Sequence, residues 1–171
     1  MGRIDAYPSP AQSGTSGQGL KDFGRVKRTA GDIALGSVVT PTWADVETSL
    51  DIVLTAATGD FIEYGISGLL GSGTDTFFDV ATIVSSAVVT YFSSGTSTAT
   101  AGGASGWYGR PSLIFPVTGS LMSPALVSGD ISSATVTLRL RYSKGGSSGR
   151  TFYATPGDPL IVWAKNLGPA M

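Results

Sequence analysis

Thr135-Val-Thr-Leu-Arg-Leu-Arg-Tyr142 is the stretch of sequence that decides the fold class. Apolar and polar residues alternate along it, and residues that alternate in this way lie on opposite faces of a β-strand. The apolar face consists of Val136, Leu138, Leu140 and Tyr142. Arg139 and Arg141 share the other face, and two interpretations of them stay open. They either keep an exposed sheet from associating, or they contact an acidic neighbouring subunit.

Similar patterns predict further strands on both sides of this stretch. Ser49–Ala56 alternates in the same way, and Phe61–Leu70 and Leu160–Leu167 also have the composition of strands, the latter the last strand of the chain. Thr58-Gly-Asp60 has the composition of a turn. We therefore expect Ser49–Ala56 and Phe61–Leu70 to form a β-hairpin.

The remaining strands are shorter or harder to delimit. We expect strands at Ile33–Thr40 and Thr151–Tyr153, and an edge strand at Leu113–Val117, where two prolines lie close by. Thr76–Phe92 is dense in β-branched and aromatic residues, and Ser85-Ser86 either divides it into two strands or marks a bulge. Counted together, these segments predict an all-β protein, an antiparallel β-sandwich or jelly roll of about eight strands.

The first 30 residues differ in composition from the rest. Residues 1–30 are rich in glycine, serine and proline and predict an extended arm, whereas residues 31–171 predict the β-sandwich domain. Leu20–Thr29 carries an excess of basic residues. It is either a solvated linker or an arm that docks on an acidic protein surface. In the second case the contact residues are Lys21, Phe23, Arg25, Lys27 and Arg28.

Composition argues against several classes of function. The chain of 171 residues contains no histidine and no cysteine, which removes the usual general base, the usual metal ligands and the usual nucleophile–base pairs. The carboxylate pairs Asp45/Glu47 and Asp75/Asp79 are interpreted as turn caps. We therefore predict that the protein is not an enzyme and has no catalytic residues, cofactor or metal site.

Charge and hydropathy bear on the partners. The net charge is −1, and the main body has no basic stripe of the kind that nucleic-acid-binding proteins carry. No apolar segment is long enough to span a membrane, and the start has no apolar signal sequence. We expect neither nucleic acid nor membrane as a partner.

A glycine- and serine-rich loop, residues 93–106, precedes an aromatic pair and a basic residue. Trp107, Tyr108 and Arg110 form a candidate outer tip for binding. They can equally be core anchors or a plug in a subunit interface.

Several blocks of the sequence resemble small structural proteins of tailed phages that infect actinobacteria. These blocks are Trp43–Leu54, Ala57–Leu69, Phe78–Ser85, Gly129–Tyr142 and Pro159–Pro169. The resemblance covers about residues 31–169. It implies a capsid decoration protein, a homotrimer with a jelly-roll body and an N-terminal arm that reaches the major capsid protein. Such a protein is made in the host cytoplasm and lies on the capsid surface of the virion, where it stabilises the shell. The alternative is a tail or fibre appendage with a host-binding role, which would use the loop before Trp107.

Overall fold

The computed structural model describes residues 20–39, 42–71, 76–93, 107–109, 115–145 and 150–170. The backbone alone is described for 107–109 and 115–117. These residues form two antiparallel β-sheets, and the described chain contains no α-helix. The prediction of an all-β sandwich is therefore confirmed, whereas the jelly-roll topology stays a prediction.

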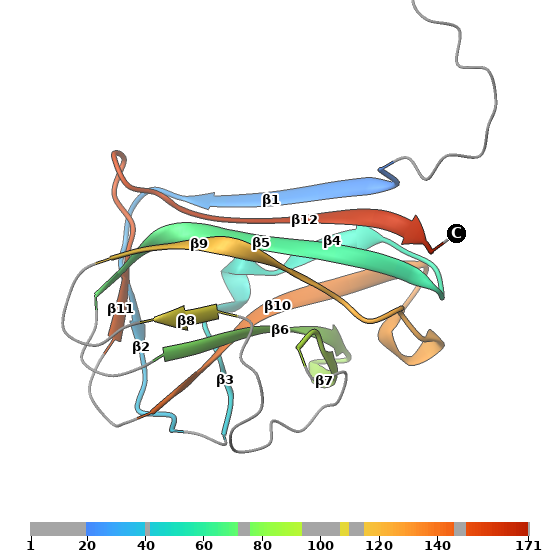
Figure 1. The fold of residues 1–171 in the computed structure, drawn as a ribbon, viewed down its shortest axis with the longest axis horizontal. Helices are drawn as coiled ribbons and strands as arrows, with labels where there is room; N and C mark the ends of the chain where they lie inside the picture. Colours follow the sequence, from blue (N-terminus) through green and yellow to red (C-terminus); the bar gives the residue numbers. More distant parts are fainter. Residues whose placement is uncertain are drawn as a thin grey trace, which may run out of the picture.

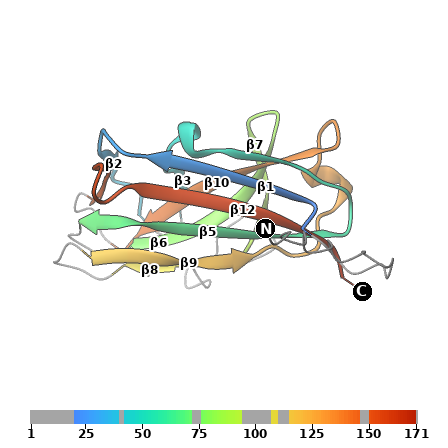
Figure 2. The same cartoon turned by 90° about the horizontal axis from the view of Figure 1, so that it is seen from above.

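The first sheet, called sheet A, is built around a long central strand (Figures 1 and 2). Strand β5 pairs with β12 on one side and with β9 on the other, and β1 pairs with the far side of β12. Of two short strands that complete the sheet, β11 pairs with the last residues of β5, and β2 pairs with β11. The strands of sheet A are β1 (Asp22–Arg28), β2 (Ile33–Leu35), β5 (Asp60–Gly71), β9 (Phe115–Met122), β11 (Arg150–Tyr153) and β12 (Leu160–Pro169).

The second sheet, called sheet B, is built around the strand that contains the alternating stretch Thr135–Tyr142. Strand β10 pairs with β6 on one side and with β3 and β4 on the other, and β6 pairs in turn with β7 and β8. Its strands are β3 (Ala44–Asp45), β4 (Ile52–Thr55), β6 (Thr76–Val84), β7 (Ala87–Tyr91), β8 (Trp107–Gly109) and β10 (Thr135–Lys144). Two 3₁₀ turns lie at Thr48–Leu50 and Ser128–Asp130.

The core lies between the two sheets and follows the alternation of the strands. On β10 the apolar face is buried, and Val136, Leu138 and Leu140 are fully inaccessible to solvent. On β12 the residues that face the core are Leu160, Val162 and Ala164. Burial of apolar area on this scale is the main favourable term in folding a chain without disulfides.

The predicted hairpin between Ser49–Ala56 and Phe61–Leu70 is wrong. Strand β4 pairs with β10 in sheet B, whereas β5 pairs with β12 and β9 in sheet A. The turn between them carries the chain across the sandwich, and Asp60 fixes this crossing by accepting a hydrogen bond from the Ala57 N–H. Alternation predicts that a segment is a strand, but it does not identify the partner strand.

The segment Thr76–Phe92 is divided at Ser85-Ser86 into two strands, as the first of the two interpretations predicted. Ser85 and Ser86 both adopt positive φ, 49° and 67°, and join β6 to β7 in a two-residue hairpin turn. Left-handed backbone at both central positions matches the twist of the flanking strands.

Leu20–Thr29, which was expected to belong to the N-terminal arm, contains a strand of the body. Strand β1 is the edge of sheet A and lies beside β12, so the first and last described strands are neighbours (Figure 2). Gly24 faces sheet B so closely that a Cβ there would overlap Ile52 of β4. The Asp22 carboxylate accepts a hydrogen bond from the Thr55 N–H of that strand. Part of the expected arm is thus built into the sandwich, while residues 1–19 lie outside the described chain.

Candidate binding face

The outward side of sheet A, called the A face, is formed by alternate residues of four adjacent strands. The strand register arranges these residues in rows that run from β1 through β12 and β5 to β9. The rows are Phe23–Lys165–Glu63–Met122, Arg25–Trp163–Gly65–Ser120 and Lys27–Ile161–Ser67–Thr118. Neighbouring strands are about 4.8 Å apart, so each row is roughly 14 Å wide.

The centre of the A face is a tryptophan that lies over a glycine. A Cβ built on Gly65 would overlap the Cε2 and Cζ2 atoms of Trp163, so the indole covers the backbone of the strand opposite. The Lys165 ammonium lies 4.6 Å from the centroid of the Trp163 ring and 3.4 Å from a carboxylate oxygen of Glu63. The central lysine is therefore neutralised within the face.

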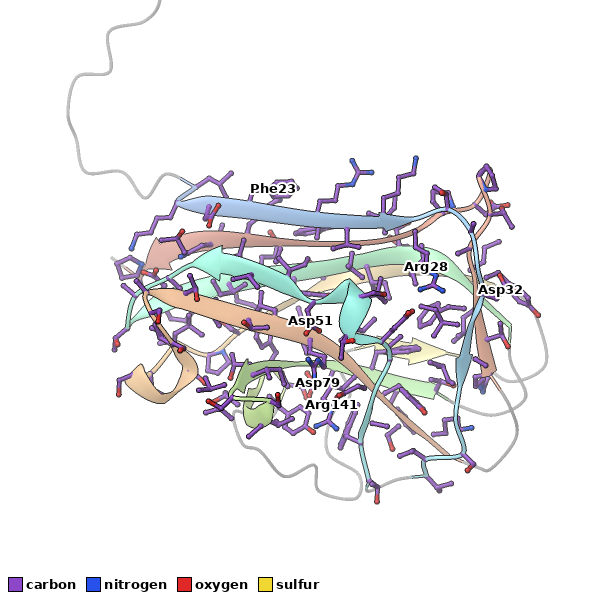
Figure 3. The ribbon with its side chains drawn as sticks, turned by 180° about the vertical axis from the view of Figure 1, so that it is seen from behind. Phe23, Arg28, Asp32, Asp51, Asp79 and Arg141 are labelled. Carbon is purple, nitrogen blue, oxygen red and sulfur yellow. The ribbon has the colours of Figure 1, made fainter. Side chains whose placement is uncertain are left out.

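The β1 edge of the A face carries uncompensated positive charge. Arg25 and Lys27 are exposed, and within the described part of the chain neither has an ion-pair partner. Phe23 precedes them on the same side of β1, is 48% exposed and projects away from the body (Figure 3). Two cations and an exposed aromatic side chain thus line this edge.

A shallow apolar pocket of about 260 Å³ lies beside Met122, at the end of the face where the chain reaches Pro169. Its walls come from β5, β9 and the end of β12. They consist of Phe61, Met122, Leu167, Gly168, Pro169 and Ala170. Met122 is 49% exposed, and its flexible thioether side chain suits a surface that adapts to a partner.

A β-bulge in β12 shapes this pocket. The register with β5 shifts between Asn166 and Gly168, so Leu167 is the extra residue and lines the pocket. The buried Asn166 side chain holds the bulge, because its Oδ1 accepts from the Gly168 N–H at 2.8 Å. Gly168 has φ +80°, where a residue with a Cβ would be strained.

The bulge rests on a buried carboxylate. Asn166 Nδ2 donates to Asp60 Oδ2 and to the Thr55 carbonyl, both at 2.8 Å. Lys21 Nζ lies 2.7 Å from Asp60 Oδ1, and Asp60 itself is 1% exposed. Burial alone would raise the pKa of Asp60, but hydrogen bonds from Lys21, Asn166 and the Ala57 N–H hold it below its usual value.

The five predicted contact residues divide into two groups. Phe23, Arg25 and Lys27 project from the A face and are available to a partner. Lys21 and Arg28 have partners inside the body. Lys21 pairs with Asp60, whereas Arg28 pairs with Glu47 and donates from Nε to the Gly31 carbonyl at 2.6 Å.

The predicted tip lies largely outside the described residues. Trp107 and Tyr108 belong to β8, which pairs with β6, but their side chains are not described, and neither is Arg110. Their assignment as a binding tip stays a prediction.

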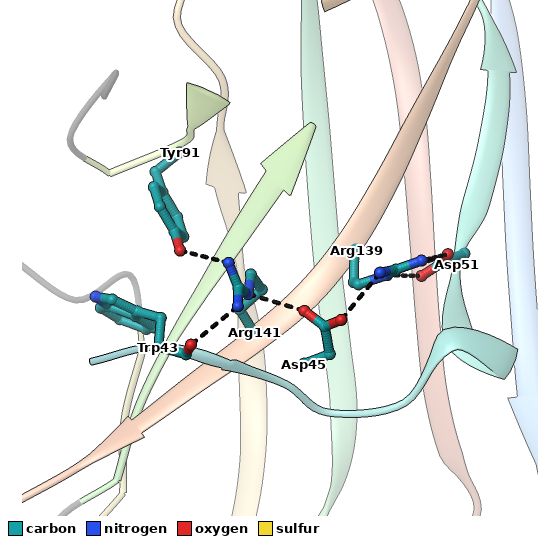
Figure 4. A network of polar contacts seen from close by, with 6 residues as sticks. All are labelled: Trp43, Asp45, Asp51, Tyr91, Arg139 and Arg141. Atoms are coloured by element: carbon teal, nitrogen blue, oxygen red, sulfur yellow. Dashed lines mark hydrogen bonds and ion pairs between the residues drawn. The ribbon is translucent and has the colours of Figure 1, made fainter. Parts of the chain in front are cut away.

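The outward side of sheet B corrects the expectation that Arg139 and Arg141 are exposed, whereas their contact with a neighbouring subunit stays a prediction. Neither arginine is exposed, since their side chains keep only 13% and 14% of their accessible area. Arg139 donates to Asp51 through Nε and Nη2, at 2.9 and 2.6 Å, and to Asp45 through Nη1 at 2.9 Å (Figure 4). Arg141 contacts the other oxygen of Asp45 and donates to the Tyr91 hydroxyl and the Trp43 carbonyl. Both arginines therefore form ion pairs with carboxylates of the same chain.

Asp79, on β6 beside Arg141, is the most perturbed carboxyl of this side. Burial raises its pKa to about 6, and hydrogen bonds from Ser93 and the Val80 N–H only partly oppose that shift. Its predicted partner Asp75 lies outside the described residues, and Asp45 and Glu47 bind different arginines. In the parts of the chain described, no three potential ligand residues gather as a metal site.

Trp163, Met122 and Leu167 of this face were not predicted from the sequence. Leu160–Leu167 was predicted as a strand, but which of its sides faces solvent depends on the other sheet. No helix among the described residues is long and apolar enough to cross a membrane. No protein-family model, curated protein or solved structure matches the chain.

Proposed function

We propose that this protein is a non-enzymatic structural component of a phage particle that decorates the outer surface of the head as a homotrimer. In this proposal the A face docks on the major capsid protein and helps to hold the shell together. The alternative is a tail or fibre appendage that binds its host through the tip near Trp107. No contact among the described residues supports this alternative.

The observation that carries the proposal is the chemistry of the A face. It is open, it spans four strands, and it combines exposed apolar side chains with two cations that have no internal partner in the described chain. Phe23 and Met122 lie at opposite ends of one row. Surfaces of this kind, with an aromatic and apolar centre and charges beside it, are typical of protein interfaces.

The resemblance to phage structural proteins supports the type of particle. A protein that clamps a shell acts by binding the assembled state, and many weak copies add up because symmetry repeats each contact. A rigid sandwich whose docking residues lie on strands suits this role, since little conformational entropy is lost when it binds.

Immunogold electron microscopy on particles of the source phage tests the location. Antibody against this chain should label the whole head, with a copy number in the hundreds. Label confined to the tail would replace decoration by the appendage function, and absence of label from all particles would reject a virion role.

A second test asks whether the A face docks. Heads assembled without this protein should bind wild-type protein, whereas the doubly reversed variant Arg25→Glu/Lys27→Glu should bind at least ten-fold more weakly. The matched control Val53→Asp changes an exposed residue of β4 in the opposite sheet and should bind like wild type. Equal binding by all three proteins would exclude the A face as the docking surface.

A further inference from the structure

The pocket beside the β12 bulge is built rather than incidental. Leu167 lines it because the bulge inserts an extra residue there, and the bulge is held by the buried Asn166–Asp60 pair. Lys21 completes that network from the β1 side. An apolar recess held in place by buried polar bonds is the kind of site that receives a single anchoring side chain of a partner.

The cations of the same face call for a partner of opposite charge. Lys165 is paired with Glu63 and lies over Trp163, so it adds little net charge to the face. Arg25 and Lys27 have no such pairing within the described chain, and they lie one and two rows away from the row of Met122. A complementary surface carries carboxylates opposite these two cations.

The distances between the two features limit the partner further. Two rows along a strand correspond to about 13 Å and three strand spacings to about 14 Å, so the pocket and the cations are roughly 15–20 Å apart. Gly65 and Ser120 lie in the row between them, and the indole of Trp163 covers Gly65. A partner must therefore present an apolar group and carboxylates at about this separation.

We infer that the A face recognises an acidic protein surface that carries one projecting apolar side chain. The apolar side chain enters the pocket between Phe61, Met122 and Leu167, and the carboxylates pair with Arg25 and Lys27. This inference rests on the proposed function, because it specifies the chemistry of the docking partner.

Nuclear magnetic resonance of the ¹⁵N-labelled full chain tests the inference with a defined probe. The probe is a synthetic peptide with one leucine, then a spacer of four residues that are glycine or serine, then four aspartates. When extended, it spans the required distance. A second peptide replaces the aspartates by lysines, and a third replaces the leucine by glycine. We expect the first peptide to shift the amide signals near Leu167, Met122, Arg25 and Lys27. The lysine peptide should shift none of them.

Variants of the protein sharpen the result. Met122→Asp should weaken binding of the first peptide at least five-fold, and Arg25→Glu/Lys27→Glu at least ten-fold. Val53→Asp is the control and should leave binding unchanged. Thermal unfolding of all variants verifies that each is folded, and Arg25→Lys should retain most of the binding. Shifts elsewhere on the protein, equal shifts with the lysine peptide, or unchanged binding by both A-face variants would overturn the inference.

The two proposals can fail separately. If heads bind wild-type protein and both A-face variants equally, decoration stands and the recognition inferred here is wrong. If the aspartate peptide binds as expected but no particle does, the recognition chemistry stands and the role in the virion is wrong.

Discussion

Strands β1 and β10 carry almost the same pattern of charge and use it in opposite ways. Each has two basic residues separated by one residue, Arg25 and Lys27 on β1, Arg139 and Arg141 on β10. On β10 both cations bind carboxylates and are largely buried, whereas on β1 both are exposed. The pair on β10 holds parts of the sandwich together, and the pair on β1 is available to a partner.

The difference comes from the neighbours of each strand. Strand β10 is central, and Asp45 of β3 and Asp51, just before β4, reach its arginines from the adjoining segments. Strand β1 is an edge strand, and its one partner among the described strands, β12, places Trp163 and Ile161 opposite Arg25 and Lys27. The same spacing of basic residues therefore stabilises the fold in one place and leaves a docking surface in the other.

Removing an arginine from β10 should have the largest effect. Arg139→Ala leaves Asp51 without its cation in a half-buried site and Asp45 with Arg141 alone, and we expect it to lower the free energy of unfolding by about 3 kcal/mol. Urea denaturation measures the change. A loss below about 1 kcal/mol would mean that the network on sheet B contributes no more than a surface ion pair.

The centre of the A face is held by packing of Trp163 on Gly65, whereas the outward side of sheet B is held by ion pairs. Gly65→Ala tests this difference. The new methyl group overlaps the indole of Trp163, so the ring must leave its place on the sheet, at a cost of about 2 kcal/mol. Gly157→Ala is the control, because no atom lies within 4 Å of a Cβ at that position. In a Trp163→Ala background most of the effect of Gly65→Ala should disappear, and the double-mutant cycle measures this coupling.

Asp79 should give sheet B a pH dependence that the A face lacks. The pKa of Asp79 is about 6 in the folded protein, against 3.8 for an unperturbed aspartate. Between these two pH values the folded state therefore binds more protons than the unfolded state. The free energy of unfolding should therefore fall as pH rises, by about 1.4 kcal/mol from pH 5 to pH 7. The chain has no histidine to titrate in that window. Asp79→Asn should remove the slope, and a slope that persists in this variant assigns it to another group.

The smallest effect is expected at the exposed pair of β1. Arg25→Ala and Lys27→Ala should each change the free energy of unfolding by less than about 0.5 kcal/mol, since neither cation has a described partner. The same urea titrations measure it. A loss comparable to that of Arg139→Ala would erase the contrast between the two strands.

The strands themselves were largely predictable because burial leaves a local trace in the sequence. Alternation placed Val136, Leu138 and Leu140 correctly in the core, and Ser85-Ser86 was recognised as a place where a run can turn. The pairing of strands was not predictable in the same way. Ser49–Ala56 and Phe61–Leu70 are adjacent in sequence and belong to different sheets, because the partners that complete each sheet come from distant parts of the chain.

The candidate site was predictable only in part. Phe23, Arg25 and Lys27 stood out as a basic, aromatic segment, but Lys21 and Arg28 could not be separated from them without knowing where Asp60 and Glu47 lie. Trp163 looks like a core residue in the sequence, since the glycine on which it lies is almost a hundred positions away. Leu167 acquires its place only through the bulge.

The pairing of β1 with β12 has a consequence for how the chain folds. Asp22 lies opposite Asn166, so this ladder joins the two ends of the described chain and closes a loop of nearly its whole length. Closing so long a loop carries an entropic cost before its contacts form, and topologies rich in such distant pairings fold slowly. A circular permutant that links the end of β12 to the start of β1 and opens at Gly157, between β11 and β12, which do not pair with each other, turns this ladder into a local hairpin, and its folding rate in water should exceed that of the natural order.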